Sequence, residues 1–289
     1  MNNVIKLAVV NFQTIWGDKE KNLNKICEYC QKAGEGNVNL IVFPETALSG
    51  YDNDKENSKK EKMHCLMAET IPGDATDRLS YYAKKYGMYI VFGMPELFED
   101  KVYNSAAIIY PDGKTDSYRK IHLPFDEKEW AEKGSEPKMI ESEWGNIGIT
   151  ICYDTYCFPE LIRYYRARGA RLVLNVTACP DIPCTLGAAK LSLPAYAYIN
   201  YVFIASANLC GKEIRSIFKG GSCIIGPDKS KGDFCVYAGK MFGDKDSDKE
   251  DLIINEIDLS LADKYTDIPI FKEDWQPKLY SKYFSEFER

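Results

Sequence analysis

Residues 148–154, GITICYD, place Cys152 at the end of an apolar, β-branched run, and this arrangement decides the kind of fold. Such a run is typical of a buried strand. A second buried strand is predicted over residues 38–43, VNLIVF, shortly before Glu45, and a more polar strand ends at Lys120. Open α/β sheets place reactive side chains where a strand gives way to a loop, so we expect these three residues in one site.

The rest of the chain alternates between strand-like and helix-like segments. Helices are predicted from a cap at Asp18 to about residue 34 and over residues 74–86, and about ten strands complete the pattern. Residues 111–113 (PDG) form a turn between two strands, which predicts a hairpin. Alternation of this kind predicts an α/β layered fold with mixed sheets. No linker or short-period repeat is visible, which favours one domain over residues 1–289.

Composition narrows the range of partners and compartments. The net charge of −6 and the absence of a basic patch argue against nucleic acid as a partner. No stretch approaches the roughly 20 apolar residues of a membrane span. The N-terminus has no secretory pattern, and the chain has 10 cysteines. Together these features favour reduced thiols and a cytoplasmic location.

Cys27 and Cys30 form a C-x-x-C pair, which raises the question of a redox or zinc site. With Leu23 and Ile26 they follow the i, i+3, i+4, i+7 spacing of a helix's buried face. A second C-x-x-C is absent and the chain has only 2 histidines. We therefore interpret the pair as buried helix residues and expect no metal site.

The order of the three motifs resembles the nitrilase (carbon–nitrogen hydrolase) superfamily, almost from end to end. The motifs are residues 43–51, 118–123 and 148–154, and the similarity extends from Gln13 to residues 274–280. The resemblance implies a four-layer α-β-β-α sandwich with two mixed β-sheets and a Glu–Lys–Cys triad. No cofactor is implied.

The triad implied by the resemblance is Glu45, Lys120 and Cys152. Each could instead be an ordinary loop, surface or strand-end residue. Together they supply a general base, an ammonium that stabilises an oxyanion, and a nucleophile that attacks as the thiolate. His122 is the competing base, but relatives usually give the second residue after the lysine a structural task, so we rank it below Glu45.

Three further residues complete the predicted site. Glu127 stands seven positions after the lysine in a Phe-Asp-Glu context, and the resemblance implies that it orients Lys120 and the NH2 group of the substrate. The backbone N–H of Tyr153 would be the second oxyanion donor, and Thr177 belongs to a segment that lines the acyl pocket by resemblance. Asp154 is expected to bond loop backbone.

We predict an amidohydrolase that cleaves a small linear amide, releases ammonia and passes through a cysteine thioester. Tyr153-Asp154 after the cysteine looks more like the amidase, ω-amidase and carbamoyl-hydrolase branches than like nitrile-cleaving relatives. An N-carbamoyl hydrolase, an acyltransferase and a non-catalytic assembly protein remain alternatives. No arginine stands out as a carboxylate anchor. The aromatic tail after about residue 261 is expected to pack in a homodimer or higher even oligomer.

Overall fold

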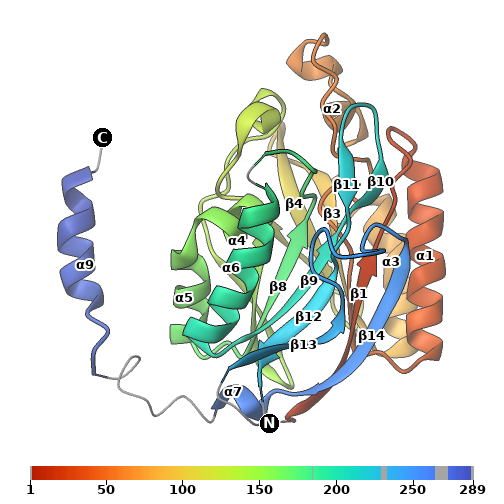
Figure 1. The fold of residues 1–289 in the computed structure, drawn as a ribbon. Coiled ribbons are helices and arrows are strands. Elements are labelled where there is room, and N and C mark those ends of the chain that lie inside the picture. The colour runs from red at the N-terminus through yellow and green to blue at the C-terminus, as the bar shows by residue number, and fades with distance from the viewer. Residues whose placement is uncertain (1, 184, 229–232, 264–272, 288–289) are drawn as a thin grey trace.

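A computed structural model describes residues 2–183, 185–228, 233–263 and 273–287 of the chain. Two six-stranded sheets pack against each other between two layers of helices (Figure 1). The first sheet, in order, is β14 (Asp251–Asp258), β1 (Val4–Asn11), β2 (Leu40–Val42), β3 (Tyr89–Phe98), β4 (Lys101–Ile109) and β5 (Thr115–Arg119). The second is β13 (Phe234–Gly239), β12 (Cys223–Pro227), β9 (Phe203–Asn208), β8 (Leu172–Thr177), β7 (Gly145–Ile151) and β6 (Lys138–Ser142).

Both sheets are mixed, as predicted. The strands β1, β2 and β3 run parallel, as do β7, β8 and β9, and the remaining neighbours in each sheet are antiparallel. The predicted hairpin is β4–β5, which pairs Ser105 with Arg119 and Ile109 with Thr115. The predicted α/β fold with two mixed sheets is confirmed.

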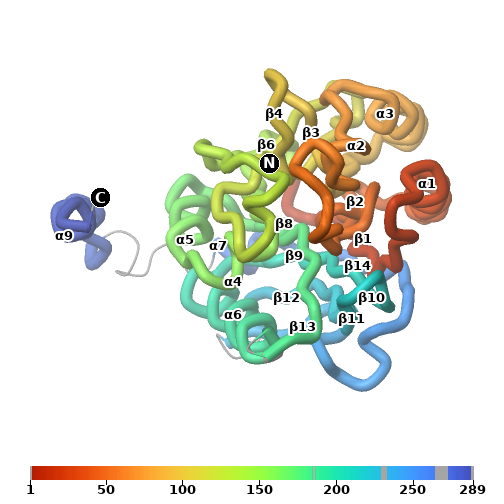
Figure 2. Tube along the Cα trace, turned by 90° about the horizontal axis from the view of Figure 1, so that it is seen from above, coloured from red at the N-terminus to blue at the C-terminus, as the bar shows by residue number. Residues whose placement is uncertain are grey.

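Helices cover the outer face of each sheet. The first sheet carries α1 (Lys19–Glu35) and α3 (Asp74–Tyr86), and the second carries α4 (Tyr153–Cys157), α5 (Pro159–Ala167) and α6 (Thr185–Asn200) (Figure 2). The shorter elements are η1 (Lys59–Glu61), α2 (Met63–Met67), η2 (Phe125–Glu129), β10 (Cys210–Lys212), β11 (Ile217–Lys219), α7 (Ser260–Asp263), α9 (Pro277–Phe284) and η3 (Ser285–Phe287). No helix among the described residues is long and apolar enough to cross a bilayer.

Apolar residues on both faces of the central strands explain the four layers. In β1, Leu7 and Val9 pack into the core between the sheets, whereas Ala8 and Val10 pack toward α1 and α3. A strand that is buried on both faces needs a covering layer on each side. A third core lies between the second sheet and its helices and includes Ile162.

The helix α1 begins after Asp18, whose side chain accepts a hydrogen bond from the Lys21 N–H. Cys27 and Cys30 are both buried in this helix and pack against the first sheet. The interpretation of the C-x-x-C pair as part of a helix's buried face is therefore confirmed.

The C-terminal helix α9 lies outside the sandwich, and none of its residues is buried (Figures 1 and 2). Its exposed apolar side chains include Leu279, Tyr280, Tyr283 and Phe284. Residues 264–272 of the aromatic tail, which include Tyr265 and Phe271, lie outside the described residues. Packing of the tail on a second copy of the chain stays a prediction.

Gly93 in β3 lets the loop that carries Glu45 lie directly on the sheet. A Cβ at Gly93 would stand 2.4 Å from the Glu45 Cα and 2.4 Å from the Thr46 nitrogen. We expect Gly93→Ala to lower the free energy of unfolding by about 1–3 kcal/mol, because the backbone must move to make room. Urea denaturation measures this. Gly187→Ala in α6, where a Cβ has open space, is the control. Equal effects of the two substitutions would contradict the steric explanation.

Candidate active site

Lys120 is a fully buried ammonium held between two buried carboxylates. It follows the end of β5, and its Nζ lies 2.6 Å from Glu45 Oε1 and 2.7 and 2.9 Å from the two oxygens of Glu127. Glu45 follows β2 in the same sheet, and Glu127 lies in η2. An ammonium that donates to two carboxylates has all its donors fixed in direction. The structure thus brings Glu45, Lys120 and Glu127 together.

Neighbouring groups fix both carboxylates. The Asn104 amide donates to Glu45 Oε1 at 2.7 Å and to Glu127 Oε2 at 3.1 Å. The Ala178 N–H donates to Glu45 Oε2 at 2.8 Å, and the Tyr51 hydroxyl donates to Glu127 Oε1 at 2.7 Å. Asn104 was not predicted as a site residue. A polar residue inside the apolar strand β4 was the only signal that could have indicated it.

Cys152 stands at the turn between β7 and α4 with φ +46° and ψ −96°. This positive φ is unusual for a residue with a side chain and indicates a backbone held by its surroundings. The Cys152 N–H donates to the Val176 carbonyl at 3.0 Å, and the Cys152 carbonyl accepts from Thr155 and Tyr156. The turn therefore fixes the thiol at the wall of a cavity that it shares with Glu127.

Electrostatics keep the resting thiol protonated. Burial raises the pKa of Cys152 well above its ordinary value, and the Glu45 carboxylate raises it further. Lys120 and the Thr177 hydroxyl act in the opposite direction. Burial would lower the pKa of Lys120, but Glu127 and Glu45 outweigh it and raise that pKa. The site at rest holds a protonated thiol and an ammonium beside two carboxyl groups.

Burial raises the pKa of Glu127 from 4.5 to about 7, against the opposing effect of Lys120. The folded chain therefore holds this proton more tightly than the unfolded chain. The associated stability is fully present below about pH 4.5 and is lost as pH rises through about 7.

Glu127→Gln removes this titration, since the amide stays neutral. We expect the thermal midpoint of the variant, relative to the original protein, to increase as pH is raised from about 5 to about 8. Thermal unfolding of both proteins across this range measures the effect. Parallel pH curves would show that Glu127 titrates at the same pH in the folded and unfolded chains.

His122 and Asp154 form a separate cluster. His122 Nδ1 lies 2.8 Å from Asp154 Oδ1, the His122 N–H donates to the same oxygen at 2.9 Å, and the ring stacks on Phe158 at 3.5 Å. The Tyr118 hydroxyl and the Ile151 N–H donate to Asp154 Oδ2. Asp154 thus bonds loop backbone, as predicted, and His122 is held by it.

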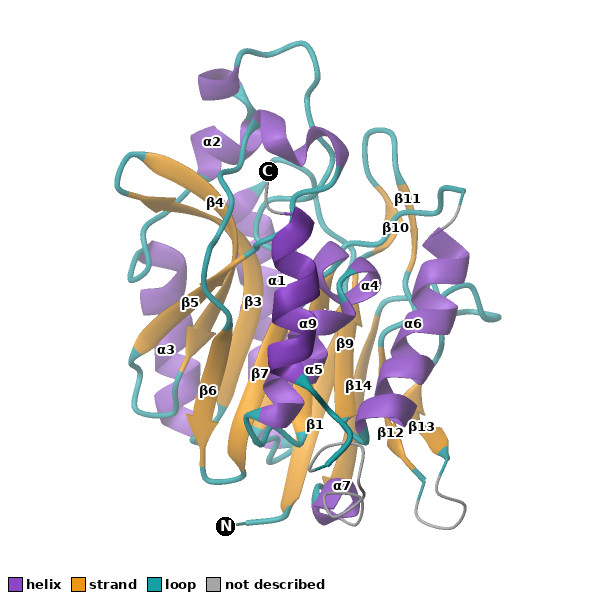
Figure 3. Cartoon of the chain, turned by 90° about the vertical axis from the view of Figure 1, so that its left-hand side faces the viewer, coloured by secondary structure: helices purple, strands orange, loops and turns teal. Residues whose placement is uncertain are grey.

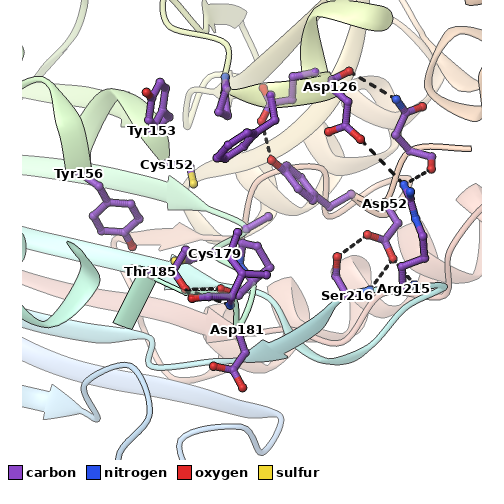
Figure 4. A pocket seen from close by; sticks show the side chains of 18 of the residues that line it. Asp52, Asp126, Cys152, Tyr153, Tyr156, Cys179, Asp181, Thr185, Arg215 and Ser216 are labelled. Carbon is purple, nitrogen blue, oxygen red and sulfur yellow. Dashed lines mark hydrogen bonds and ion pairs between the residues drawn. The ribbon is translucent and has the colours of Figure 1, made fainter. Parts of the chain in front are cut away.

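A cavity of about 750 Å³ opens from Cys152 (Figure 4). Five aromatic side chains contribute to its wall: Tyr51, Phe125, Trp130, Tyr153 and Tyr156. Thr177 is buried at the end of β8. The pairing of Ile151 with Val176 places it beside Cys152. Ala178 and Cys179, which follow Thr177, line the cavity.

Charged residues stand on the same cavity wall, among them Asp52, Lys55, Asp126 and Arg215. Arg215 lies in the loop between β10 and β11. These two strands and α2 lie at the same end of the sandwich (Figure 3). No arginine stood out in the sequence as a residue that would bind a carboxylate. The structure places Arg215 in the cavity wall, and an isolated arginine in a loop gave no signal of this.

Comparison with known proteins identifies the family. The model of the carbon–nitrogen hydrolase family matches residues 6–267. The chain belongs to the carbon–nitrogen hydrolase family. It is a hydrolase that acts on carbon–nitrogen bonds other than peptide bonds.

The similarity to curated relatives and to solved structures extends over nearly the whole hydrolase. A probable nitrilase from Schizosaccharomyces pombe is 32% identical over 93% of this chain and 94% of that protein. The Omega-amidase NIT2 of Xenopus tropicalis is 32% identical over the same shares, 93% and 94%. An amidase mutant from Nesterenkonia sp. AN1 has the same fold, with a TM-score of 0.77, 24% identity and 96% of both chains covered. That mutant is described with an acetamide moiety bound covalently to its active-site cysteine.

Proposed function

We propose that the hydrolase cleaves the carboxamide of a small linear amide through a thioester on Cys152 and releases ammonia. The observation that carries this proposal is the pairing of buried Lys120 with Glu45 and Glu127 at the cavity that Cys152 lines. A base, an oxyanion donor and a thiol are the groups that acyl transfer requires. The amidase and ω-amidase activities named for relatives support the same chemistry.

The first half-reaction forms the thioester. The Cys152 thiol has a raised pKa, so its proton passes to the Glu45 carboxylate as the sulfur attacks the amide carbon. The carbonyl oxygen becomes an oxyanion, which the Lys120 ammonium and the Tyr153 N–H stabilise. When the C–N bond breaks, Glu45 returns the proton to the leaving nitrogen, and ammonia departs.

The second half-reaction restores the thiol. Glu45 takes a proton from water, whose oxygen attacks the thioester carbon. The C–S bond then breaks, the carboxylic acid is released, and the proton on Glu45 passes to the sulfur. Glu127 bonds Lys120 throughout and orients its Nζ toward the oxyanion. Each turnover consumes one amide and one water and gives one acid and one ammonia.

Two measurements test the proposal. Ammonia release is assayed with linear amides, ω-amides and N-carbamoyl compounds, and acid-quenched protein is digested and analysed by mass spectrometry. We expect release from a linear amide or ω-amide, together with an acyl mass on the peptide that contains Cys152. Release from N-carbamoyl compounds alone would favour the carbamoyl-hydrolase alternative. An acyl adduct that transfers to added amines faster than to water would indicate an acyltransferase.

A further inference from the structure

Two loops at the cavity are hydrogen-bonded to each other through two acidic side chains. Glu213 accepts from the Tyr51 N–H at 2.9 Å and from the Asp52 N–H at 2.8 Å. In return, Asp52 Oδ2 accepts from the Arg215 N–H at 2.6 Å and from the Ser216 N–H at 2.9 Å. This reciprocal bonding fixes the segment after β10 against the segment that follows Glu45.

The loop that contains Tyr51 also contacts one of the two carboxylates that bond Lys120. Tyr51, whose N–H is held by Glu213, donates its hydroxyl to Glu127, the carboxylate that bonds Lys120. Asp52, the residue after Tyr51, accepts a hydrogen bond from the Arg215 N–H. The position of the Arg215 backbone is therefore fixed relative to the site at which the carbonyl would react.

The Arg215 guanidinium is only partly used by the protein. Its Nη2 donates to the Asn53 carbonyl and lies 4.0 Å from Asp126 Oδ2, a separation too long for a hydrogen bond. The Nε and Nη1 groups have no acceptor among the described residues. A guanidinium has five N–H donors in a fork that matches a carboxylate.

The acidic residues around Arg215 are already engaged. Asp52 accepts the backbone bonds described above and one from the Ser216 hydroxyl. Asp126 lies between two cations, 3.9 Å from Lys55 and 4.0 Å from Arg215. Asp181, elsewhere on the wall, lies 3.7 Å from Lys219. Lys55 also lines the cavity, but its ammonium is a point charge, whereas the unused N–H groups of Arg215 belong to a planar fork that matches a carboxylate.

We propose that Arg215 binds the carboxylate at the far end of the substrate and selects amides of the form carboxamide–spacer–carboxylate. Cys152 and Arg215 line one cavity and stand at opposite sides of it (Figure 4). A linear substrate then places its carboxamide at Cys152 and its carboxylate at the guanidinium, with its spacer along the aromatic wall. This inference rests on the proposed amide hydrolysis.

The test compares amides of matched shape that differ in charge. Succinamate is paired with 4-methylpentanamide, in which an isopropyl group replaces the carboxylate, and kcat and KM are measured for both. We expect the enzyme to prefer succinamate by at least about 10-fold in kcat/KM, as one charge-assisted pair allows. Arg215→Gln should lower kcat/KM for succinamate by about 30- to 100-fold, mainly through KM. The kcat/KM for the neutral amide should fall much less in the same variant.

Lys55→Gln is the matched control, because Lys55 lines the same cavity and carries the same charge but is more exposed. Lys55→Gln should change kcat/KM for both amides by similar small factors. Arg215→Lys should keep part of the preference for succinamate that Arg215→Gln loses. Equal losses for the two amides in Arg215→Gln, or an original enzyme that prefers the neutral amide, would overturn the inference while leaving amide hydrolysis intact. No ammonia from any amide would instead refute the proposed function and the inference together.

Discussion

Replacement of Cys152 by alanine is expected to abolish ammonia release, with a loss in kcat of at least about 10⁴-fold. In the proposed mechanism the sulfur of Cys152 forms the covalent intermediate, and neither Glu45 nor Lys120 can replace it. The side chain is small and lies at a cavity wall, so removal of its sulfur leaves the buried Lys120 cluster intact. Steady-state ammonia assays and thermal unfolding of the variant measure the two expectations.

Cys157→Ala provides the control for this prediction. Cys157 lines the same cavity and is exposed, so its removal tests whether any thiol at the wall matters. We expect the control to keep activity within a few-fold of the original and to retain the acyl adduct on the Cys152 peptide. Activity that survives in Cys152→Ala, or an acyl adduct on the Cys157 peptide in place of the Cys152 peptide, would rule out Cys152 as the nucleophile.

Much of the fold could be predicted because the apolar pattern marks most strands and helices along the chain. The alternation of strand-like and helix-like segments predicted a layered α/β fold, and the turn at residues 111–113 predicted one antiparallel pair. The arrangement in four layers was implied by the family resemblance. The edge strand β6 (Lys138–Ser142) was missed because its residues are mostly polar or half-buried. A short strand of mostly polar residues lacks the apolar periodicity on which such predictions depend.

The residues of the candidate site also divide into those that could be predicted from the sequence and those that could not. Glu45, Lys120 and Cys152 follow strands, so their meeting could be predicted from where the strands end. Asn104 and Arg215 could not be predicted. The first depends on pairing of β4 with β3 and β5, and the second on hydrogen bonds between loops more than 160 residues apart in sequence. Long-range contacts of single polar side chains leave no periodic signal in a sequence.

Lys120→Met is the second substitution with a large expected effect, because it affects both stability and catalysis. Methionine keeps most of the side-chain volume but leaves Glu45 and Glu127 buried together without a cation. Removal of one partner from a buried ion pair costs about 3–5 kcal/mol of unfolding free energy. Activity should fall by at least about 10²-fold, since the proposed mechanism loses an oxyanion donor. Urea denaturation and ammonia assays measure the two losses.

A second variant separates these two effects of Lys120. In Lys120→Met the Glu127 carboxyl group loses the cation that opposes the effect of burial on its pKa, so it should hold its proton more tightly in the folded chain. The stability of this variant should therefore fall as pH rises through neutrality. The double variant Lys120→Met, Glu127→Gln has one buried carboxyl group fewer, and we expect it to recover about half of the lost stability at pH 7. It should recover no activity, because the ammonium beside the oxyanion is still absent. Activity that returned with stability would mean that Lys120 serves only to neutralise buried charge.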